Sequence, residues 1–253
     1  MTNAHEKLVE AQFGPRAKAY VDSAVHARGP DLDALEGVVS DAHPVHALDL
    51  GAGGGHVSYL MARHATRVTA ADLSEEMLAT IRATARANGL ANIDAAQALA
   101  ERLPFPDAHF DFLASRYSVH HWRDVEAGLR EAHRVLAPGR RAAFIDVYAP
   151  AKAQLDTHLQ AVELLRDASH VRDYSLAEWV AALSRAALSI ETLRSWRIRL
   201  DFDSWTARMR TPADNARAIR ALQAAATAEV AGHFAIEPDG SFTIDVLMLV
   251  ARK

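Results

Sequence analysis

A glycine-rich turn between an apolar run and an amphipathic stretch limits what this chain can fold into. Val45 to Leu50 is mostly apolar, glycines follow at positions 51, 53, 54 and 55, and His56 to His64 carries apolar residues at helical spacing. This pattern predicts a strand, a tight loop and a helix. Glycine lets the backbone turn sharply and approach a ligand, and the unpaired N–H groups at a helix start can face that ligand.

An acid at the end of a second predicted strand strengthens the case for a ligand site. The strand is predicted at Arg67–Ala71 and is followed by Asp72. This acid comes about 20 residues after the first glycine of the turn, the spacing at which a carboxylate meets a ribose in nucleotide-type sites. The loop alone is a weak indication of such a site, and the loop together with the acid is a stronger one.

Composition excludes several kinds of chemistry. The 253 residues are 50% hydrophobic and 24% charged, which predicts a globular domain with one sizeable core. The chain has no cysteine, so disulfides, thiolate metal sites, a thiol nucleophile and iron–sulfur clusters are excluded. A net charge of −4 gives no broad positive surface for nucleic acid. With no apolar secretion signal and no apolar stretch of about 18 residues, we expect no membrane partner and a cytoplasmic location.

The middle of the chain alternates between predicted strands and predicted helices. Further strands are expected near Asn92–Ala98, Phe110–Ser115 and Ala142–Val147, and the helix before the last of these is expected at Val125–Leu136. Such alternation predicts a parallel sheet covered by helices on both faces. Ligands of such sheets bind beyond the carboxyl ends of the strands.

The two ends of the chain are mainly helical in pattern. Residues 1–40 predict an N-terminal helical lid, residues 41–150 the ligand-binding core, and residues 151–253 a C-terminal part. That last part is expected to hold a strand near Ser189–Leu200, a helical insertion at about 203–233 and a final strand at Phe242–Ala251. Since no low-complexity linker or internal repeat interrupts the chain, we expect residues 1–253 to form a single domain.

Four motifs resemble, in their order, those of class I S-adenosylmethionine-dependent methyltransferases. They are LDLGAGGG at 48–55, DLS at 72–74, LPF at 103–105 and RVLAPG at 134–139. Within this class the chain is similar to the ubiquinone/menaquinone C-methyltransferase-like branch. A closer resemblance, to YafE-type methyltransferases, extends over nearly the whole chain and rests on residues 115–122, 165–172 and 202–210. The resemblance implies a Rossmann-like α/β fold with a seven-stranded, mostly parallel sheet whose last strand runs antiparallel between the fifth and sixth.

The resemblance also implies S-adenosylmethionine as the cofactor and assigns residues to it. The methionine end would be held by Asp49, Gly51, Ala52 and Gly53. Asp72 would bind the ribose hydroxyls, and Leu73 would cover one face of the adenine. Ala100 would meet the adenine edge through its backbone N–H, and Ser115 would add a contact at the end of the fourth strand. Many family members have an acid before the Ala100 position, where this chain has Leu99.

Two adjacent histidines are the candidates for a catalytic base. Transfer of a methyl group from a sulfonium depends mainly on alignment, and a base is needed only when the acceptor must lose a proton. His120 and His121 follow the fourth strand on the ligand side of the sheet, and histidine titrates near neutral pH. The alternative is that they orient the loop and pack against Trp122. His43 and His46 are loosely spaced and lack a carboxylate cluster, so we predict no metal site.

Candidate substrate contacts combine aromatic rings with guanidinium groups. Arg116 and Tyr117 follow the same strand end and are expected to face the cleft, where they would meet the cofactor carboxylate or an acidic substrate. Trp205 and Arg208 share a helix face, and Tyr20 belongs to the predicted lid. Together these residues suggest a planar or anionic small molecule. The plainer alternatives are a solvated helix face and packing of the lid.

Three classes of function fit these patterns to different degrees. The first is methyl transfer to a small molecule through oxygen, carbon or nitrogen. The second is an NAD(P)-dependent oxidoreductase, although His56 stands where the third glycine of the dinucleotide motif belongs and no Tyr-x-x-x-Lys pair is present. The third is a non-catalytic partner subunit, and the intact glycine loop argues against it. The acceptor atom and the oligomeric state, with a homodimer as one alternative, stay open.

Overall fold

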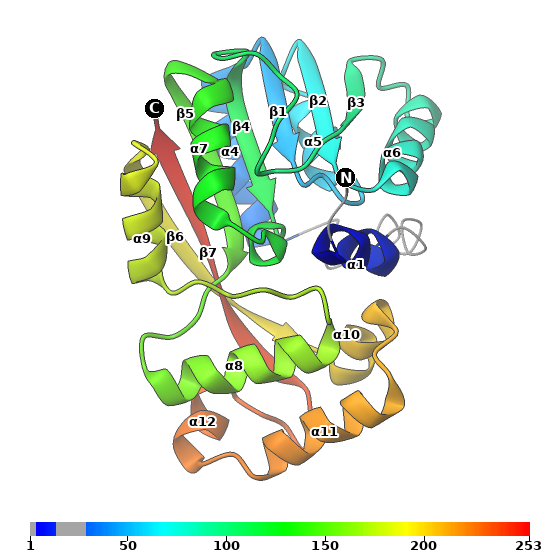
Figure 1. Ribbon diagram of the computed structural model, residues 1–253, viewed down its shortest axis with the longest axis vertical. Coiled ribbons are helices and arrows are strands. Elements are labelled where there is room, and N and C mark those ends of the chain that lie inside the picture. The colour runs from blue at the N-terminus through cyan, green and yellow to red at the C-terminus, as the bar shows by residue number, and fades with distance from the viewer. Residues whose placement is uncertain (1–3, 14–28) are drawn as a thin grey trace.

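A seven-stranded sheet runs through the whole molecule (Figure 1). The computed structural model describes residues 4–13 and 29–253. Its strand order is β3-β2-β1-β4-β5-β7-β6. The strands are β1 (His46–Leu50), β2 (Arg67–Asp72), β3 (Ile93–Gln97), β4 (Phe110–Arg116), β5 (Leu136–Val147), β6 (Ser189–Leu200) and β7 (Phe242–Arg252). β1 to β5 pair in parallel, and β7 runs antiparallel to both β5 and β6. The predicted α/β fold, including the antiparallel last strand, is therefore confirmed.

Helices cover both faces of this sheet and also lie beyond the carboxyl ends of its parallel strands (Figure 1). They are α1 (Ala4–Phe13), α4 (Pro30–Ala42), α5 (His56–Met61), α6 (Glu75–Ala87), α7 (Val125–Val135), α8 (Ala153–Arg166), α9 (Leu176–Arg185), α10 (Phe202–Met209), α11 (Ala213–Ala224) and α12 (Ala228–His233). Leu35 of α4 and Met61 of α5 belong to one buried apolar cluster, and Leu129 of α7 and Trp179 of α9 belong to another. In the described residues, no helix has both the length and the apolarity that a membrane crossing requires.

The helix after β2 begins and ends on signals that are visible in the sequence. The Ser74 hydroxyl accepts a hydrogen bond from the Met77 N–H at 3.3 Å, and Glu75 and Glu76 lie in the first turn. Gly89, with φ of 69°, follows the last turn. A hydroxyl N-cap, acids at the positive end of the helix dipole and a left-handed glycine after the C-terminus each favour this helix at this place.

The junction between α7 and β5 differs from the sequence prediction. We expected the helix to continue through Leu136 and the strand to start at Ala142, but the helix ends at Val135 and the strand begins at Leu136. Leu136 is fully buried and pairs with Phe110 of β4. Burial of this apolar side chain in the sheet outweighs the breaking tendency of Pro138 and Gly139, and the pairing register shifts between Phe110 and Phe112 to accommodate the longer strand.

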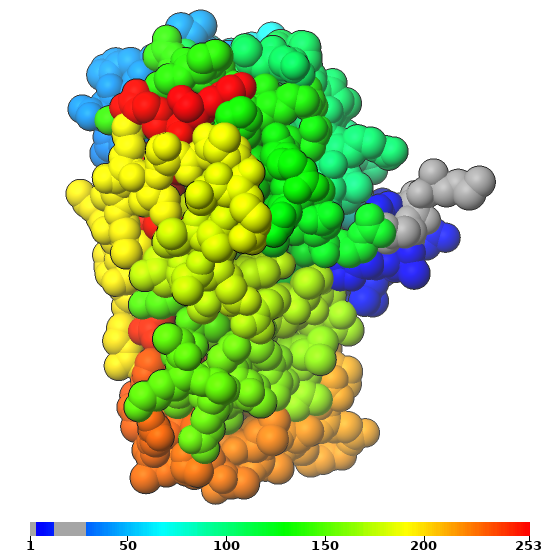
Figure 2. Space-filling model, turned by 60° about the vertical axis from the view of Figure 1, so that its left-hand side comes forward, coloured from blue at the N-terminus to red at the C-terminus, as the bar shows by residue number. Residues whose placement is uncertain are grey.

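The C-terminal helices form a layer beyond the carboxyl ends of the parallel strands. α10, α11 and α12 lie between β6 and β7 in the sequence, which confirms the helical insertion before the last strand. They pack with α8 around the lower ends of β6 and β7 (Figure 1). α4, which the sequence placed within an N-terminal lid, packs on the sheet through Leu35 and Val39 instead. α1 lies at the side of the molecule, between the sheet core and the C-terminal helices (Figure 2).

Candidate functional site

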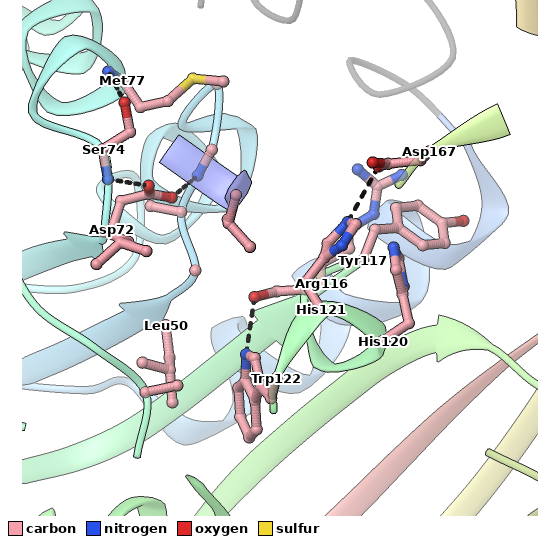
Figure 3. A pocket seen from close by; sticks show the side chains of 18 of the residues that line it. Leu50, Asp72, Ser74, Met77, Arg116, Tyr117, His120, His121, Trp122 and Asp167 are labelled. Atoms are coloured by element: carbon pink, nitrogen blue, oxygen red, sulfur yellow. Dashed lines mark hydrogen bonds and ion pairs between the residues drawn. The ribbon is translucent and has the colours of Figure 1, made fainter. Parts of the chain in front are cut away.

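A cavity lies between the carboxyl ends of the parallel strands and the C-terminal helices (Figure 3). Its sheet side is formed by the loop after β1, by residues 72–74 after β2, by residues 98–101 after β3 and by residues 116–123 after β4. The opposite side comes from α8 and α10, and α1 contributes His5, Glu6 and Val9. His5 Nε2 donates to the His121 carbonyl at 3.0 Å and ties α1 to this site.

The glycine loop has left-handed backbone at three positions, and at two of them the space around the glycine shows what an added side chain would displace. Gly51, Gly53 and Gly55 have φ angles of 75°, 50° and 83°. A Cβ on Gly51 would collide with the side chain of Ser118, so this glycine allows two chain segments to approach closely. A Cβ on Gly53 would have no described atom within 4 Å. Since Gly53 lines the cavity, that Cβ would occupy space in which a ligand could lie.

Asp72 fixes the glycine loop to the end of β2. Its Oδ2 accepts a hydrogen bond from the Gly53 N–H at 2.8 Å, and its Oδ1 accepts from the Ser74 N–H at 2.9 Å (Figure 3). Burial raises the pKa of Asp72, and these backbone donors partly oppose that change. The predicted ribose contact therefore falls on a carboxylate that is already held in place by two main-chain groups.

Asp49 is a buried carboxylate with an unsatisfied oxygen beneath the same loop. It is 1% exposed, and its Oδ2 accepts a hydrogen bond from the Ser58 hydroxyl at 2.6 Å. Its Oδ1 has no hydrogen-bond partner among the described residues. Burial raises the pKa of Asp49 to about 7. A lone acceptor on the cavity wall fits a ligand that brings a positive charge or a hydrogen-bond donor.

The two adjacent histidines differ in their protonation. His120 Nδ1 lies 2.6 Å from Asp146 Oδ1. Burial alone would lower the pKa of His120, but the negative charges of Asp146, Asp173 and Glu163 raise it to about 9. For His121, burial and the neighbouring His120 lower the pKa to about 3. At neutral pH His120 therefore carries a proton and His121 is uncharged.

Hydrogen bonding defines the tautomer of the uncharged ring. His121 Nδ1 lies 3.2 Å from the Ser169 carbonyl oxygen, which can only accept, so Nδ1 carries the hydrogen. His121 Nε2 is then the unprotonated nitrogen and lies 4.0 Å from Asp167 Oδ2 (Figure 3). The Trp122 indole N–H donates to the Ser118 hydroxyl at 3.1 Å, which fixes the loop that carries both histidines.

Arg116 is paired with an acid that the sequence analysis did not single out. Its Nε donates to Asp31 Oδ2 of α4 at 2.6 Å, and both side chains are buried. Its guanidinium lies 4.6 Å from the centre of the Tyr117 ring, and burial raises the pKa of that tyrosine. Because Asp31 compensates the charge of Arg116, the structure weakens the expectation that this arginine meets an acidic ligand.

The predicted contacts on α10 lie on the far side of the cavity. Trp205 is 1% exposed, and the Arg166 guanidinium of α8 lies 4.9 Å from the centre of its ring. Arg166 also donates to the Trp205 carbonyl at 3.2 Å and pairs with Glu163 at 3.2 Å. Arg208 lines the cavity too. α8 and α10 thus present an aromatic ring and charged groups to the same space.

Most of the site residues predicted from the sequence meet at this cavity. It is lined by Asp49, Gly51, Ala52, Gly53, Asp72, Leu73, Leu99, Ala100, Arg116, Tyr117, His120, His121, Trp205 and Arg208. Ser115 is not among the described lining residues, because successive strand residues point to opposite faces and Ser115 is buried within the sheet. Its predicted cofactor contact is therefore not supported. Tyr20 lies outside the described residues.

The sequence analysis missed a group of buried acids at the end of the cavity opposite the glycine loop. Glu163, Asp167 and Asp173 line it, and Asp146 lies behind His120. One signal was present for Asp146, since it interrupts the otherwise apolar end of the fifth strand. Asp167 and Asp173 have polar neighbours in the sequence and gave no such signal, and Glu163, although it stands between Val162 and Leu164, belongs to a stretch of helical pattern in which a single acid is usual.

Comparison with known proteins agrees with this geometry. The family described as Methyltransferase domain matches residues 48–144. The uncharacterised protein YafE of Escherichia coli is 45% identical over 199 residues, which cover 79% of this chain and 96% of YafE. The uncharacterised methyltransferase YcgJ of Bacillus subtilis is 36% identical over 210 residues, which cover 83% of each chain. The crystal structure of YcgJ superposes with a TM-score of 0.84 at 32% identity, over 88% of this chain and 97% of YcgJ.

Proposed function

Because this chain belongs to the class I S-adenosylmethionine-dependent methyltransferases, we propose that it methylates a small molecule enclosed between the glycine loop and the helices α1, α8 and α10. The observation that carries this proposal is the continuous cavity, which joins the cofactor loop to a polar chamber. The acceptor atom is oxygen, carbon or nitrogen. A small-molecule acceptor is favoured because the chamber is walled by helices and because the net charge of −4 gives no basic surface for nucleic acid.

The residues at the glycine loop fit S-adenosylmethionine. The orphaned Asp49 oxygen offers an acceptor for the amino group of the methionine end, and the space in front of Gly53 leaves room for a ligand next to the backbone. We assign Asp72 to the ribose, and Leu73, Leu99 and Ala100 to the adenine. When bound, the cofactor supplies a methyl group on a positively charged sulfur. The protein therefore needs to orient the acceptor and exclude water rather than activate a leaving group.

Titration of cofactor analogues onto the wild-type protein tests the proposed function directly. We expect S-adenosylhomocysteine to bind with one-to-one stoichiometry in isothermal titration calorimetry, because the loop residues match its amino acid and ribose groups. We expect NAD to give no heat of binding, since His56 stands where a dinucleotide site needs its third glycine. Binding of NAD in place of S-adenosylhomocysteine would refute the proposed function.

Within this proposal, His121 is the group that accepts a hydrogen bond from the acceptor. Its Nε2 is unprotonated across the neutral range, whereas His120 already holds its proton next to Asp146. Its low pKa makes His121 a weak proton acceptor, so we assign it a hydrogen bond that orients the acceptor, and His121→Ala should slow turnover by about tenfold without changing the affinity for S-adenosylhomocysteine. Release of S-adenosylhomocysteine with a panel of small hydroxyl, amine and acidic-carbon acceptors measures the rate.

The pH dependence of that rate separates the two histidines. If His121 is the accepting group, its protonation state does not change between about pH 5 and 8, because its pKa is about 3. Titration of His121 should therefore cause no change in the rate over this range. With His120 as the base, the rate would rise with pH up to about 9, where this imidazole loses its proton. His133→Ala on α7, which is not a described lining residue, serves as the control. Unchanged turnover in His121→Ala would leave that residue a structural role only.

A further inference from the structure

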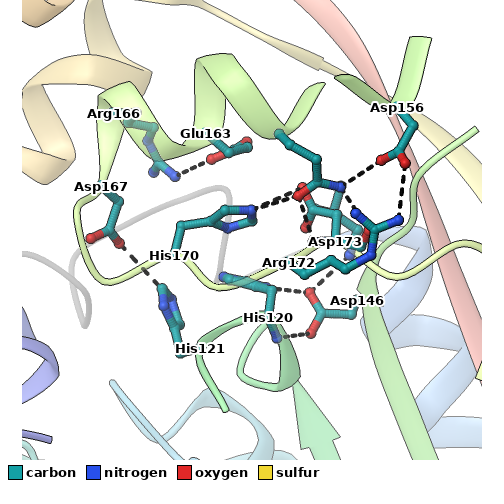
Figure 4. Close-up of polar contacts among 12 residues, drawn as sticks. His120, His121, Asp146, Asp156, Glu163, Arg166, Asp167, His170, Arg172 and Asp173 are labelled. Carbon is teal, nitrogen blue, oxygen red and sulfur yellow. Dashed lines mark hydrogen bonds and ion pairs between the residues drawn. The ribbon is translucent and has the colours of Figure 1, made fainter. Parts of the chain in front are cut away.

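A buried cluster of one imidazole and two carboxylates, His120, Asp146 and Asp173, adjoins the cavity, which His120 and Asp173 line; Figure 4 shows the three side chains. His120 comes from the segment after β4, Asp146 from the end of β5, and Asp173 from the segment before α9. One nitrogen or oxygen atom from each residue lies within 4.8 Å of the others. Asp146 and Asp173 are each 1% exposed.

The backbone of Asp173 is held firmly, yet one oxygen of its carboxylate lacks a hydrogen-bond partner in the described residues. Its backbone N–H donates to Gln160 Oε1 at 3.1 Å, and its carbonyl accepts from Gln160 Nε2 at 2.8 Å. Its Oδ2 is buried and has no hydrogen-bond partner in the part of the chain that the structure describes. His170 Nε2 is 3.9 Å away and is hydrogen bonded to Gln160 Oε1 at 3.0 Å. A rigid, buried and unsatisfied carboxylate is costly unless something binds to it.

The neighbouring cationic side chains are engaged with other acids. Arg172 pairs with Asp156 and Glu178, each at 2.9 Å, and Arg166 pairs with Glu163 (Figure 4). The two buried carboxylates of the cluster therefore have imidazoles rather than guanidinium groups beside them: His120 lies 2.6 Å from Asp146 Oδ1, and His170 lies 3.9 Å from Asp173 Oδ2. A cation with two positive charges would compensate both carboxylates.

In place of the sequence expectation of no metal site, we propose that His120, Asp146 and Asp173 bind a divalent metal cation, which would displace the proton that His120 otherwise holds next to Asp146. Two carboxylate oxygens and one imidazole nitrogen are a ligand set that suits Mn²⁺, Fe²⁺ or Zn²⁺. Three protein ligands leave coordination positions open, as in catalytic metal sites. His120 and Asp173 line the cavity, so an open position can face the acceptor space. The metal site itself is independent of methyl transfer, and its role rests on the proposed function: the cation would orient an acceptor through an oxygen atom.

Titration of Mn²⁺ tests this site without knowledge of the acceptor. The full-length wild-type protein is treated with a chelator, and free Mn²⁺ is followed by electron paramagnetic resonance as protein is added. We expect saturable binding of one Mn²⁺ per chain. Asp173→Asn and Asp146→Asn should weaken this binding by more than about tenfold, since even changes outside the ligand shell cost ~10- to 100-fold in metal affinity.

A matched substitution controls for the general loss of a carboxylate charge in this region. Asp156→Asn removes a carboxylate that pairs with Arg172 and lies outside the cluster, and the amide oxygen of the new side chain can still accept the hydrogen bond from Gln160 Nε2. We expect this variant to bind Mn²⁺ as the wild type does. Absence of saturable Mn²⁺ and Zn²⁺ binding to the wild-type protein would overturn the proposal, and so would equal affinity in Asp173→Asn. S-adenosylhomocysteine binding is measured on the same samples, so failure of the metal site is distinguished from failure of the proposed function.

Discussion

Gly53→Val is expected to abolish cofactor binding while the protein stays folded. A Cβ at this position would meet no described atom within 4 Å outside the neighbouring residues, and Gly53 lines the cavity, so we expect the valine side chain to displace the cofactor rather than the chain. The left-handed φ of 50° adds backbone strain, which costs about 1–3 kcal/mol. We expect the affinity for S-adenosylhomocysteine, measured by calorimetry, to fall by more than about a hundredfold, which corresponds to ~2.7 kcal/mol.

Gly89→Val provides a control with the same strain and no ligand nearby. Gly89 has φ of 69° and follows α6, and a Cβ at this position would likewise meet no described atom within 4 Å. It is not a described lining residue of the cavity. Both variants should lose similar thermal stability, but Gly89→Val should bind S-adenosylhomocysteine as the wild type does. Tight binding by Gly53→Val would place the cofactor elsewhere.

The cofactor end of the site could be predicted from the sequence because its signals are local. The loop at Gly51–Gly55 and the acid Asp72 each follow a strand directly, and parallel strands bring their carboxyl ends to one edge of a sheet. The cap at Ser74 is equally local. Once the alternation of strands and helices was recognised, these residues had to lie together. The structure brings them together as expected.

At the acceptor end, the partners of the predicted residues could not be predicted in the same way, because these contacts join distant segments. Arg116 and its buried partner Asp31 are 85 residues apart, and His120 and Asp146 are 26 apart. Asp173 belongs to a segment between helices that has no periodic pattern of its own. A charged residue in such a segment usually faces solvent, so nothing in the sequence distinguished Asp173 from a surface acid. Packing of the C-terminal helices decides its burial.

The cavity therefore has two chemically different ends. At the first, backbone N–H groups and the carboxylates of Asp49 and Asp72 suit a ligand that most members of the family share. At the second, His120, His121 and the acids from α8 and its following segment form a polar chamber that depends on the particular helices packed over it. We expect changes at the first end to alter cofactor affinity, and changes at the second to alter turnover or the choice of acceptor.

Asp49→Asn is expected to stabilise the ligand-free protein at alkaline pH and to weaken cofactor binding. An unfolded chain ionises Asp49 near pH 4, whereas burial holds its pKa near 7 in the folded state. The folded state therefore binds more protons between these values, and the stabilisation that the neutral carboxyl provides is lost as pH rises from about 4 to 7. An amide cannot ionise, so the variant should gain on the order of 2–4 kcal/mol at pH 8 relative to wild type.

Whereas the stability of the wild-type protein falls as Asp49 ionises, its affinity for the cofactor should rise. Ionised Asp49 attracts the positively charged amino group of the cofactor, so wild-type affinity for S-adenosylhomocysteine should rise as pH increases through about 7 and level off near 8. Asp49→Asn should bind more weakly at pH 8, without this rise. Thermal melts and calorimetry between pH 6 and 8.5 measure both effects.

Asp94→Asn, which removes an exposed carboxylate paired with Arg67, is the control and should change neither the stability nor the affinity appreciably. If Asp49→Asn is less stable than the wild type at pH 8, burial of the ionised carboxylate does not destabilise the folded protein as we expect. If the variant keeps the wild-type affinity, Asp49 does not contact the cofactor.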